Sequence, residues 1–142
     1  MFTGEYRHSV DEKGRLAVPA RFRTQLDGGA FISKWIDGCL AIFTRAEWDQ
    51  LADKVGSLPI ADPNARNFSR FIFSSAFDFE LDRQGRLVVP PGLRSWAGLE
   101  ADAIVVGARD HAEVWSPARW AQYQAQIETA EALAEHLTGL GI

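Results

Sequence analysis

Side chains alternate between apolar and polar character near the start of the chain, over residues 6–11. A period of two residues is typical of a strand with one buried face, and here the buried positions would be Tyr6, His8 and Val10. The same alternation returns 71 residues later, with its buried positions at Phe77, Phe79 and Leu81. The sequence therefore predicts two equivalent, half-buried strands.

Each of these strands runs into a short turn that contains an aspartate and a glycine. The aspartate side chain can begin the turn by hydrogen-bonding to the local backbone, and the glycine supplies the positive φ that a tight reversal needs. A second strand is expected after each turn, over 15–18 and 86–89, and each is ended by a proline. The turn-shaping residues are Asp11 and Gly14 in the first turn, and Asp82 and Gly85 in the second.

The two turns belong to an internal repeat of the sequence. Residues 11–23 align with residues 82–94 at an offset of 71, and seven of the thirteen aligned positions are identical. After one inserted residue the match continues, and Phe43–Trp48 aligns with Trp115–Trp120. We therefore interpret the chain as two copies of one unit. The copies span 5–48 and 76–119, with a linker and bridging helix over 57–75 and a C-terminal helix over 120–142.

The rest of each copy is predicted to combine apolar strands with short helices. Thr44 and Glu47 have the spacing of a capping box and predict the start of a helix. A helix is also expected over 63–75, although residues 71–73 fit a strand equally well. The apolar strands are expected at Ala30–Trp35, Leu40–Phe43, Ala103–Gly107 and Glu113–Trp115.

The tail after residue 120 has apolar residues at alternating spacings of three and four. This heptad-like pattern predicts an apolar seam along one helix face. The seam would pack either on the chain's own sheet or on a neighbouring subunit, and the sequence leaves both options open. Its residues are Trp120, Tyr123, Ile127, Ala130, Ala134 and Leu137.

Composition narrows the classes of protein that fit. Apolar residues make up 46% of the chain, and the formal net charge of −4 disfavours a protein that coats nucleic acid without sequence preference. Cys39 is the only cysteine, which excludes a disulfide bond within the chain, and we expect it to be buried. The first residues lack the apolar core of a signal peptide, and no run is long enough to span a membrane. We therefore expect a cytoplasmic protein without a cofactor.

The aspartate and arginine that enclose each turn carry the candidate chemistry. Arg15 and Arg86 each stand four residues after the aspartate of their turn. A local ion pair would shape the turn and, if exposed, add roughly 0–1 kcal/mol. Alternatively, the turn and the guanidinium together would present hydrogen-bond donors to a phosphate or to a guanine edge. The two interpretations are compatible, since the aspartate can shape the turn while the arginine stays partly free.

Basic residues are distributed unequally between the two copies. Residues 7–23 hold five basic and two acidic side chains, a net charge of +3, whereas residues 78–94 hold three of each. The difference includes Gln84 in place of Lys13 and Asp78 in place of Arg7. The sequence therefore predicts that the first copy is the stronger binder of a polyanion.

The repeated motif closely resembles that of the MraZ proteins, which carry two tandem SpoVT/AbrB-like units. The resemblance implies an α+β, mostly β fold, namely a swapped-hairpin barrel built from both repeats, with short peripheral helices. It also implies that several subunits form a ring. The resemblance is carried by Asp11-x-x-x-Arg15 and Asp82-x-x-x-Arg86, each set in Gly-Arg-Leu-x-Val-Pro, and by the opening Phe2-x-Gly4-Glu5-Tyr6.

The same resemblance implies a function. MraZ proteins are bacterial regulators that bind repeated boxes upstream of the division and cell-wall gene cluster, including their own promoter. The implied partners are double-stranded DNA and further copies of the chain, and the implied location is the nucleoid. The DNA-contact candidates are Lys13 and Arg15, with Arg86 as the second-copy equivalent and Arg7 as a further basic residue of the first copy.

Two other classes of function compete with this interpretation. An enzyme is disfavoured because His8 occupies a buried strand position, and no phosphate loop, nucleophile motif or metal-ligand spacing is recognisable. An assembly or antidote-like module without DNA binding is the stronger alternative, because hairpins of this type also occur in toxin-neutralising proteins.

Overall fold

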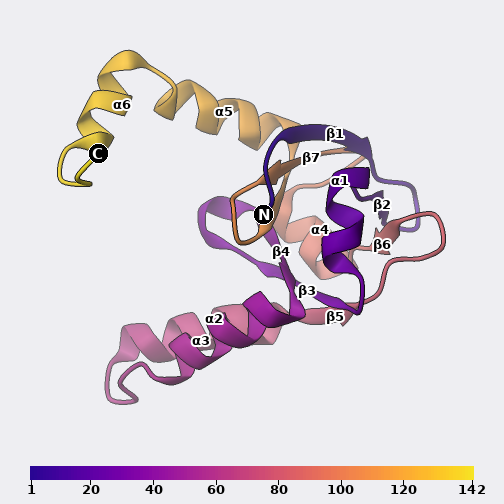
Figure 1. The fold of residues 1–142 in the computed structure, drawn as a ribbon, viewed down its shortest axis with the longest axis horizontal. Coiled ribbons are helices and arrows are strands. Elements are labelled where there is room, and N and C mark those ends of the chain that lie inside the picture. The colour runs from indigo at the N-terminus through magenta and orange to yellow at the C-terminus, as the bar shows by residue number, and fades with distance from the viewer.

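Strands from both copies interleave in one antiparallel sheet in the computed structural model, which describes residues 1–142 (Figure 1). The strand order is β1-β7-β8-β4-β3-β5, so that β1 pairs with β7 and β5 pairs with β3. The first strand of each copy therefore joins a later strand of the other copy. The first copy supplies β1 (Glu5–Ser9), β3 (Ala30–Lys34) and β4 (Leu40–Thr44), and the second supplies β5 (Phe77–Phe79), β7 (Asp102–Gly107) and β8 (Ala112–Trp115).

The second strand of each copy lies outside this sheet. β2 (Arg15–Ala17) and β6 (Arg86–Val88) pair antiparallel with each other and form a two-stranded ribbon. Within the first turn, strand pairing is limited to one bridge between Val10 and Leu16. The two strands predicted around each turn thus exist, but they pair mainly between the copies, because Leu16 and Leu87 meet in a shared core.

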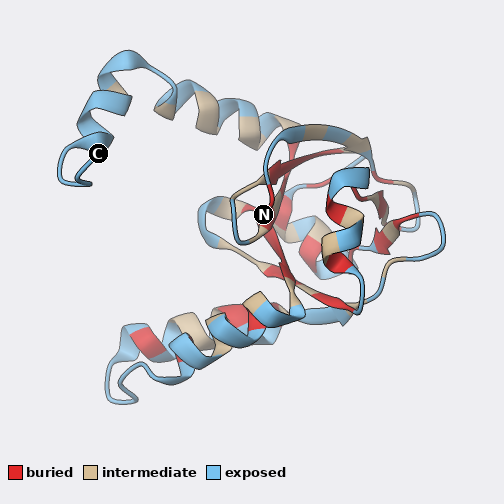
Figure 2. Ribbon diagram, viewed as in Figure 1, coloured by how far each residue is buried: buried red, intermediate tan, exposed pale blue.

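One hydrophobic core fills the space between the sheet, the ribbon and two short helices, α1 (Ala20–Arg23) and α4 (Pro91–Ala97) (Figure 2). Phe22 of α1 and Leu93 of α4 occupy equivalent positions of the repeat, and both are buried. The rings of Phe2 and Tyr6 contact Phe22 edge to face, with centroids 5.0 and 5.5 Å away. Burying one such side chain contributes about 1.5–3 kcal/mol, so these contacts hold α1 firmly on the sheet. Two 3₁₀ helices, η1 (Thr24–Leu26) and η2 (Ile36–Gly38), complete the first copy.

The helices α2 (Arg45–Gly56) and α3 (Pro63–Ser75) connect the two copies along the chain and form an arm that extends away from the sheet (Figure 1). The predicted start of α2 is confirmed, because Thr44 Oγ1 accepts a hydrogen bond from the amide of Glu47 at 3.2 Å. In α2, Trp48 and Val55 are buried as the helix periodicity requires. The alternative strand over 71–73 is wrong, since this segment lies in the last turn of α3.

The C-terminal segment consists of two helices, α5 (Pro117–Ile127) and α6 (Ala130–Leu137), instead of the single helix expected over 120–142. The division has a local cause, because Thr129 caps α6 by accepting a hydrogen bond from the amide of Ala132 at 3.1 Å. Trp120 and Tyr123 of α5 pack against Trp115 of β8. The predicted seam therefore packs on the chain's own sheet along α5, whereas no residue of α6 is buried.

Two further predictions about burial have different outcomes. Cys39 is fully buried, as expected, and burial raises the pKa of its thiol. Phe77 was expected on the buried side of its strand, but 48% of the residue is exposed. The reason is that β5 is a three-residue strand at the edge of the sheet, paired only with β3. None of the helices has the length and apolar character that crossing a membrane requires.

Candidate nucleic-acid interface

Loop 1 (Asp11–Arg15) is a tight turn organised by the side chain of its aspartate. Asp11 Oδ1 accepts hydrogen bonds from the amides of Lys13 at 3.0 Å and Arg15 at 2.9 Å. The amide of Gly14 donates to the carbonyl of Asp11 at 2.9 Å, and Gly14 has a φ of +80°. The amide and guanidinium of Arg15 lower the pKa of Asp11, so this carboxyl group stays ionised and keeps the turn closed.

Loop 2 (Asp82–Arg86) has the same geometry. Asp82 Oδ1 accepts hydrogen bonds from the amides of Gln84 and Arg86, both at 2.9 Å, and Gly85 has a φ of +74°. The amide and guanidinium of Arg86 lower the pKa of Asp82 in the same way. Since the two loops differ in sequence at the other two of their five positions, their common shape follows from the aspartate, the glycine and the arginine.

The arginine at the end of each loop makes one ion pair and keeps donors free for another partner. Arg15 Nε bonds Asp11 Oδ2, and Arg86 Nε bonds Asp82 Oδ2 at 3.0 Å. Only the Nε of each guanidinium makes a hydrogen bond within the protein, and both side chains are partly exposed. An arginine held in this way presents its two terminal nitrogens in a fixed direction, which suits bidentate bonds to a phosphate or a guanine.

Both arginines lie on the outer face of the β2–β6 ribbon. Arg15 is opposite Val88, and Arg86 is opposite Ala17. Residues directly opposite each other in an antiparallel pair share a face, and the intervening leucines point into the core. Strand geometry puts the Cα atoms of Arg15 and Arg86 roughly 8 Å apart. One small face therefore carries two guanidinium groups, one from each copy.

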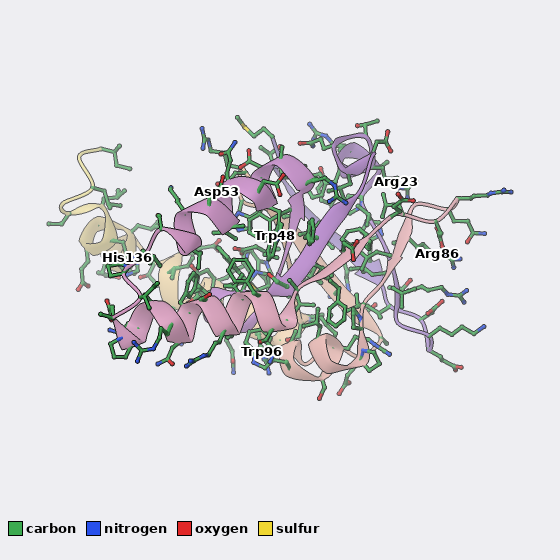
Figure 3. The ribbon with its side chains drawn as sticks, turned by 90° about the horizontal axis from the view of Figure 1, so that it is seen from below. Arg23, Trp48, Asp53, Arg86, Trp96 and His136 are labelled. Carbon is green, nitrogen blue, oxygen red and sulfur yellow. The ribbon has the colours of Figure 1, made fainter.

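Each loop is also in contact with an arginine from the opposite copy. Arg94 Nε donates a hydrogen bond to the carbonyl of Val89 at 3.0 Å, and the amide of Val89 donates to the carbonyl of Gly14 at 2.8 Å. At loop 2, Arg23 Nε donates to the carbonyl of Val18 at 2.9 Å, and the amide of Val18 donates to the carbonyl of Gly85 at 3.0 Å. Figure 3 shows Arg23 and Arg86 at the same end of the molecule, far from His136.

The sequence interpretation did not assign a role to Arg23 or Arg94. A signal for them was present, because both residues end the aligned segment and are identical in the two copies. What the alignment did not reveal is that each arginine serves the loop of the other copy. That relationship follows only from the pairing of β2 with β6.

The charges around the two loops differ from those counted along the sequence. Arg7, on β1, forms an exposed ion pair with Asp102 of β7 at 3.1 Å. With the opposite-copy arginine included, loop 1 has three basic and two acidic side chains, and loop 2 has three basic and one acidic. Exposed Arg83 of loop 2 stands where loop 1 has Glu12. The charge advantage predicted for the first copy is therefore absent at the loops, although Lys13 remains an exposed cation of loop 1.

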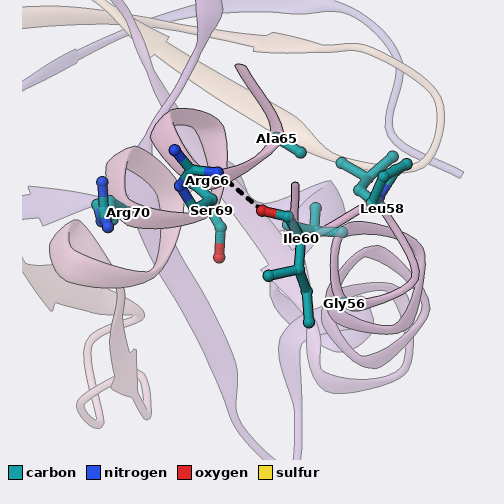
Figure 4. Close-up of a pocket in the computed structure, with 9 residues that line it drawn as sticks. Gly56, Leu58, Ile60, Ala65, Arg66, Ser69 and Arg70 are labelled. Carbon is teal, nitrogen blue, oxygen red and sulfur yellow. Dashed lines mark hydrogen bonds between the residues drawn. The ribbon is translucent and has the colours of Figure 1, made fainter. Parts of the chain in front are cut away.

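A shallow pocket lies in the α2–α3 arm (Figure 4). Its volume is about 230 Å³, and Leu58 and Ile60 contribute apolar surface to it. Arg66 and Arg70 lie on one side, and Arg66 Nη1 donates a hydrogen bond to the carbonyl of Ile60 at 2.8 Å. The pocket does not include any residue of the candidate interface.

A family model described as "MraZ protein, putative antitoxin-like" matches the chain twice, over residues 1–71 and 72–139. The chain belongs to the MraZ family. The boundary between the two matches agrees with the offset of 71 residues found between the aligned turns. The family model therefore describes one unit, and the structure interleaves two such units in one chain.

Curated relatives extend this similarity over the whole chain. A protein of Thermomicrobium roseum named Transcriptional regulator MraZ is 48% identical over 142 residues, which is 99% of both chains. The protein of the same name from Desulfitobacterium hafniense is also 48% identical, over the full length of both chains. A third, from Roseiflexus castenholzii, is 49% identical over 84% of each chain.

Proposed function

We propose that the protein is a transcription regulator that binds double-stranded DNA with sequence preference. The observation that carries this proposal is the pair of arginines, Arg15 and Arg86, on one outer face of the ribbon. Each arginine is fixed by an aspartate while its terminal nitrogens stay unbonded. The name of the relatives supports the proposal, since they are called transcriptional regulators.

The ribbon is the element that we propose to meet the DNA. The major groove of B-DNA is about 12 Å wide and admits a two-stranded β-ribbon. Arg15 and Arg86 would contact guanine edges or phosphates from the outer face, and Lys13 would contact the phosphate backbone. Arg7 is a weaker candidate, because Asp102 already neutralises part of its charge. Both copies contribute to the site in this arrangement.

The proposed targets and location come from the resemblance of the motif to MraZ proteins. The DNA would be repeated boxes upstream of the division and cell-wall gene cluster, including the promoter of the chain's own gene. The protein would act in the cytoplasm, at the nucleoid. The interleaved sheet and ribbon are consistent with a swapped-hairpin barrel, which we propose as the description of the fold.

We further propose that several copies assemble into a ring. A single chain of net charge −4 offers only a few cations to DNA, so that tight binding needs several ribbons on one body. The helix α6 supports assembly, because 47% of Leu133 and 43% of Leu137 are exposed without a partner in the chain. Glutamates on α6 are complementary to Arg66 and Arg70 on α3, which makes another copy a suitable partner.

An antidote-like module that binds a protein partner is the second candidate. The exposed apolar surface of α6 favours it, because such a surface also fits another protein. The description of the family as antitoxin-like points the same way. In that case Arg15 and Arg86 would only shape their loops, and the protein would not protect any promoter box.

A footprint on the DNA upstream of the chain's own gene tests the proposal. We expect protection of repeated boxes by the unaltered protein and loss of protection by the double variant Arg15→Ala/Arg86→Ala. The variant Arg45→Ala is the matched control, since it removes one exposed arginine from α2, away from both loops. Absence of protection at any box, with a folded protein, would overturn the proposal and leave the protein-binding module.

A further inference from the structure

Few contacts connect loop 1 to the rest of the protein. The hydrogen bonds within the loop all involve Asp11. They therefore shape the turn but do not fix its orientation relative to the rest of the protein. The carbonyl of Gly14 accepts a hydrogen bond from the amide of Val89, and Arg94 Nε bonds the carbonyl of that same valine. The peptide groups of Val89 thus lie between loop 1 on one side and the guanidinium of Arg94 on the other.

The guanidinium of Arg94 also packs directly on Gly14. A Cβ atom built at Gly14 would lie 2.8 Å from both Nε and Cζ of Arg94, which is closer than real Cβ contacts allow. Gly14 is buried, although it stands in a loop at the surface. The bare Cα of this glycine is therefore the surface on which the arginine of the other copy rests.

Loop 2 repeats this arrangement with the roles of the copies exchanged. Arg23 bonds the carbonyl of Val18, the amide of Val18 bonds Gly85, and a Cβ at Gly85 would collide with the side chain of Arg23. The same set of contacts thus occurs twice in one chain. Both arginines are retained although the aligned segments differ at six of thirteen positions, which indicates a role for them.

We propose that Arg94 and Arg23 are positioning residues, and that each fixes the DNA-reading loop of the opposite copy. This inference rests on the proposed function of the loops. A loop that is already fixed before binding loses less conformational entropy when it meets DNA, so that its arginine binds more tightly. Arginine suits the role because its planar guanidinium can pack on the glycine while Nε bonds the carbonyl, which lysine cannot do.

Amide hydrogen exchange on the full-length protein, without DNA, tests the crossed arrangement. We expect Arg94→Met to speed exchange in loop 1 by about tenfold, as for the loss of one charged hydrogen bond, and to leave loop 2 unchanged. Arg23→Met should speed exchange in loop 2 alone. Arg45→Met, which removes an exposed arginine from α2, is the control and should change neither loop. Exchange that rises in the loop of the mutated copy, or in neither loop, would overturn the inference.

DNA affinity provides the second measurement. We expect Arg94→Met to weaken binding to a promoter box roughly two- to tenfold, the cost of ordering loop side chains on binding. Arg94→Lys should not restore either the affinity or the slow exchange, although it restores the charge. Full rescue by lysine, or lower affinity with unchanged exchange, would make Arg94 a simple phosphate contact and overturn the positioning role.

The two measurements separate the inference from the proposed function. If exchange follows the crossed pattern but Arg15→Ala leaves DNA binding intact, the proposed function fails and the positioning of the loops stands. If Arg15→Ala abolishes binding while Arg94→Met alters neither exchange nor affinity, the positioning role fails and the proposed function stands.

Discussion

Leu16 of the first copy lies directly opposite Leu87 of the second, and both are at least 99% buried. Their contact joins the ribbon to the main core, where both belong to the same cluster of buried side chains. The outer face of the ribbon can carry two arginines because this inner face is held in the core. The geometry of the candidate interface thus depends on apolar residues that never meet DNA.

The first prediction concerns this contact. Replacing Leu16 by alanine should lower the free energy of unfolding by about 2–5 kcal/mol, because it leaves a cavity beneath the ribbon. Val88→Ala is the control on the outer face, where 57% of the residue is exposed, and it should change stability by less than about 0.5 kcal/mol. Denaturant unfolding measures both, and equal effects would contradict the assigned inner and outer faces.

The second prediction compares Gly14 of loop 1 with a glycine elsewhere. Gly14→Ala faces both a positive φ of +80° and the side chain of Arg94, whereas Gly28→Ala faces only a φ of +87°, with no atom within 4 Å. We expect Gly28→Ala to cost about 1–2 kcal/mol of stability and Gly14→Ala to cost more. If the two variants unfold at the same denaturant concentration, the packing of Arg94 on Gly14 is energetically unimportant.

The third prediction concerns the relative weight of the two loops in DNA binding. Because the loops have the same hydrogen bonds and similar local charge, we now expect Arg15→Ala and Arg86→Ala to weaken binding to a similar degree. Each variant should lose about 1–3 kcal/mol of binding free energy if its arginine contacts a base. If the arginine contacts a phosphate, the slope of log affinity against log salt concentration should instead fall by about one unit. A much larger loss of DNA affinity for Arg15→Ala than for Arg86→Ala, measured in a salt titration, would contradict this expectation. It would support the stronger binding by the first copy that the charges of residues 7–23 and 78–94 predict.

The fourth prediction concerns pH and the histidine at the β7–β8 turn. Burial opposes protonation of His111, but hydrogen bonds to Glu113 at 2.9 Å and Asp110 at 2.7 Å outweigh it and raise its pKa. Because His111 binds its proton more tightly in the folded state, protonation of His111 stabilises the fold. This stabilisation is complete below a pH of about 6.5, the ordinary pKa of histidine, and is lost as the pH rises through the raised pKa of His111. His111→Gln should abolish this pH dependence of the free energy of unfolding. The prediction would be contradicted if the wild-type protein gained stability relative to the variant as the pH rose from about 6.5 through the raised pKa.

The fifth prediction concerns assembly. If the proposed ring forms, Leu133→Asp and Leu137→Asp should reduce it to smaller species, as measured by analytical ultracentrifugation, while leaving the fold of the chain intact. Ile36→Asp, at another exposed apolar residue, is the control and should not change the oligomer.

Loss of the oligomer should weaken DNA binding by roughly 10²–10⁴ if several ribbons bind neighbouring boxes together. For the same reason, inserting about five base pairs between two boxes should weaken binding, because it turns one box to the far side of the duplex. Tight binding by a verified monomer, independent of box spacing, would contradict the role of the ring.

Much of the local structure follows from the sequence, because local patterns determine it. Thr44 and Glu47 begin α2 as predicted, and Asp11 and Asp82 organise their turns through contacts within five residues. Phe77 differs because its burial depends on the position of β5 at the sheet edge. The alternation of apolar and polar residues within β5 does not show whether the strand lies at the edge or in the middle of the sheet.

The candidate site was only partly accessible from the sequence for a related reason. Arg15 and Arg86 belong to a recognisable motif, so their candidacy followed from residue type and spacing. Arg94 became relevant only when the structure brought it to Gly14, which lies 80 positions earlier in the chain. Charge counts along sequence windows could not reveal such contacts either, since they counted Arg23 with the first copy although it contacts the loop of the second.

The exchange of strands between the copies also has a consequence for synthesis on the ribosome. Glu5 of β1 pairs with Val106 of β7, so the first strand has no partner until some 100 further residues have been made. At 5–20 residues per second, this delay is roughly 5–20 s. During that time the apolar side of β1 and the strand edge beside it are exposed to other nascent chains. The protein therefore folds as a whole only after β7 has been made, and the first copy cannot complete its sheet alone.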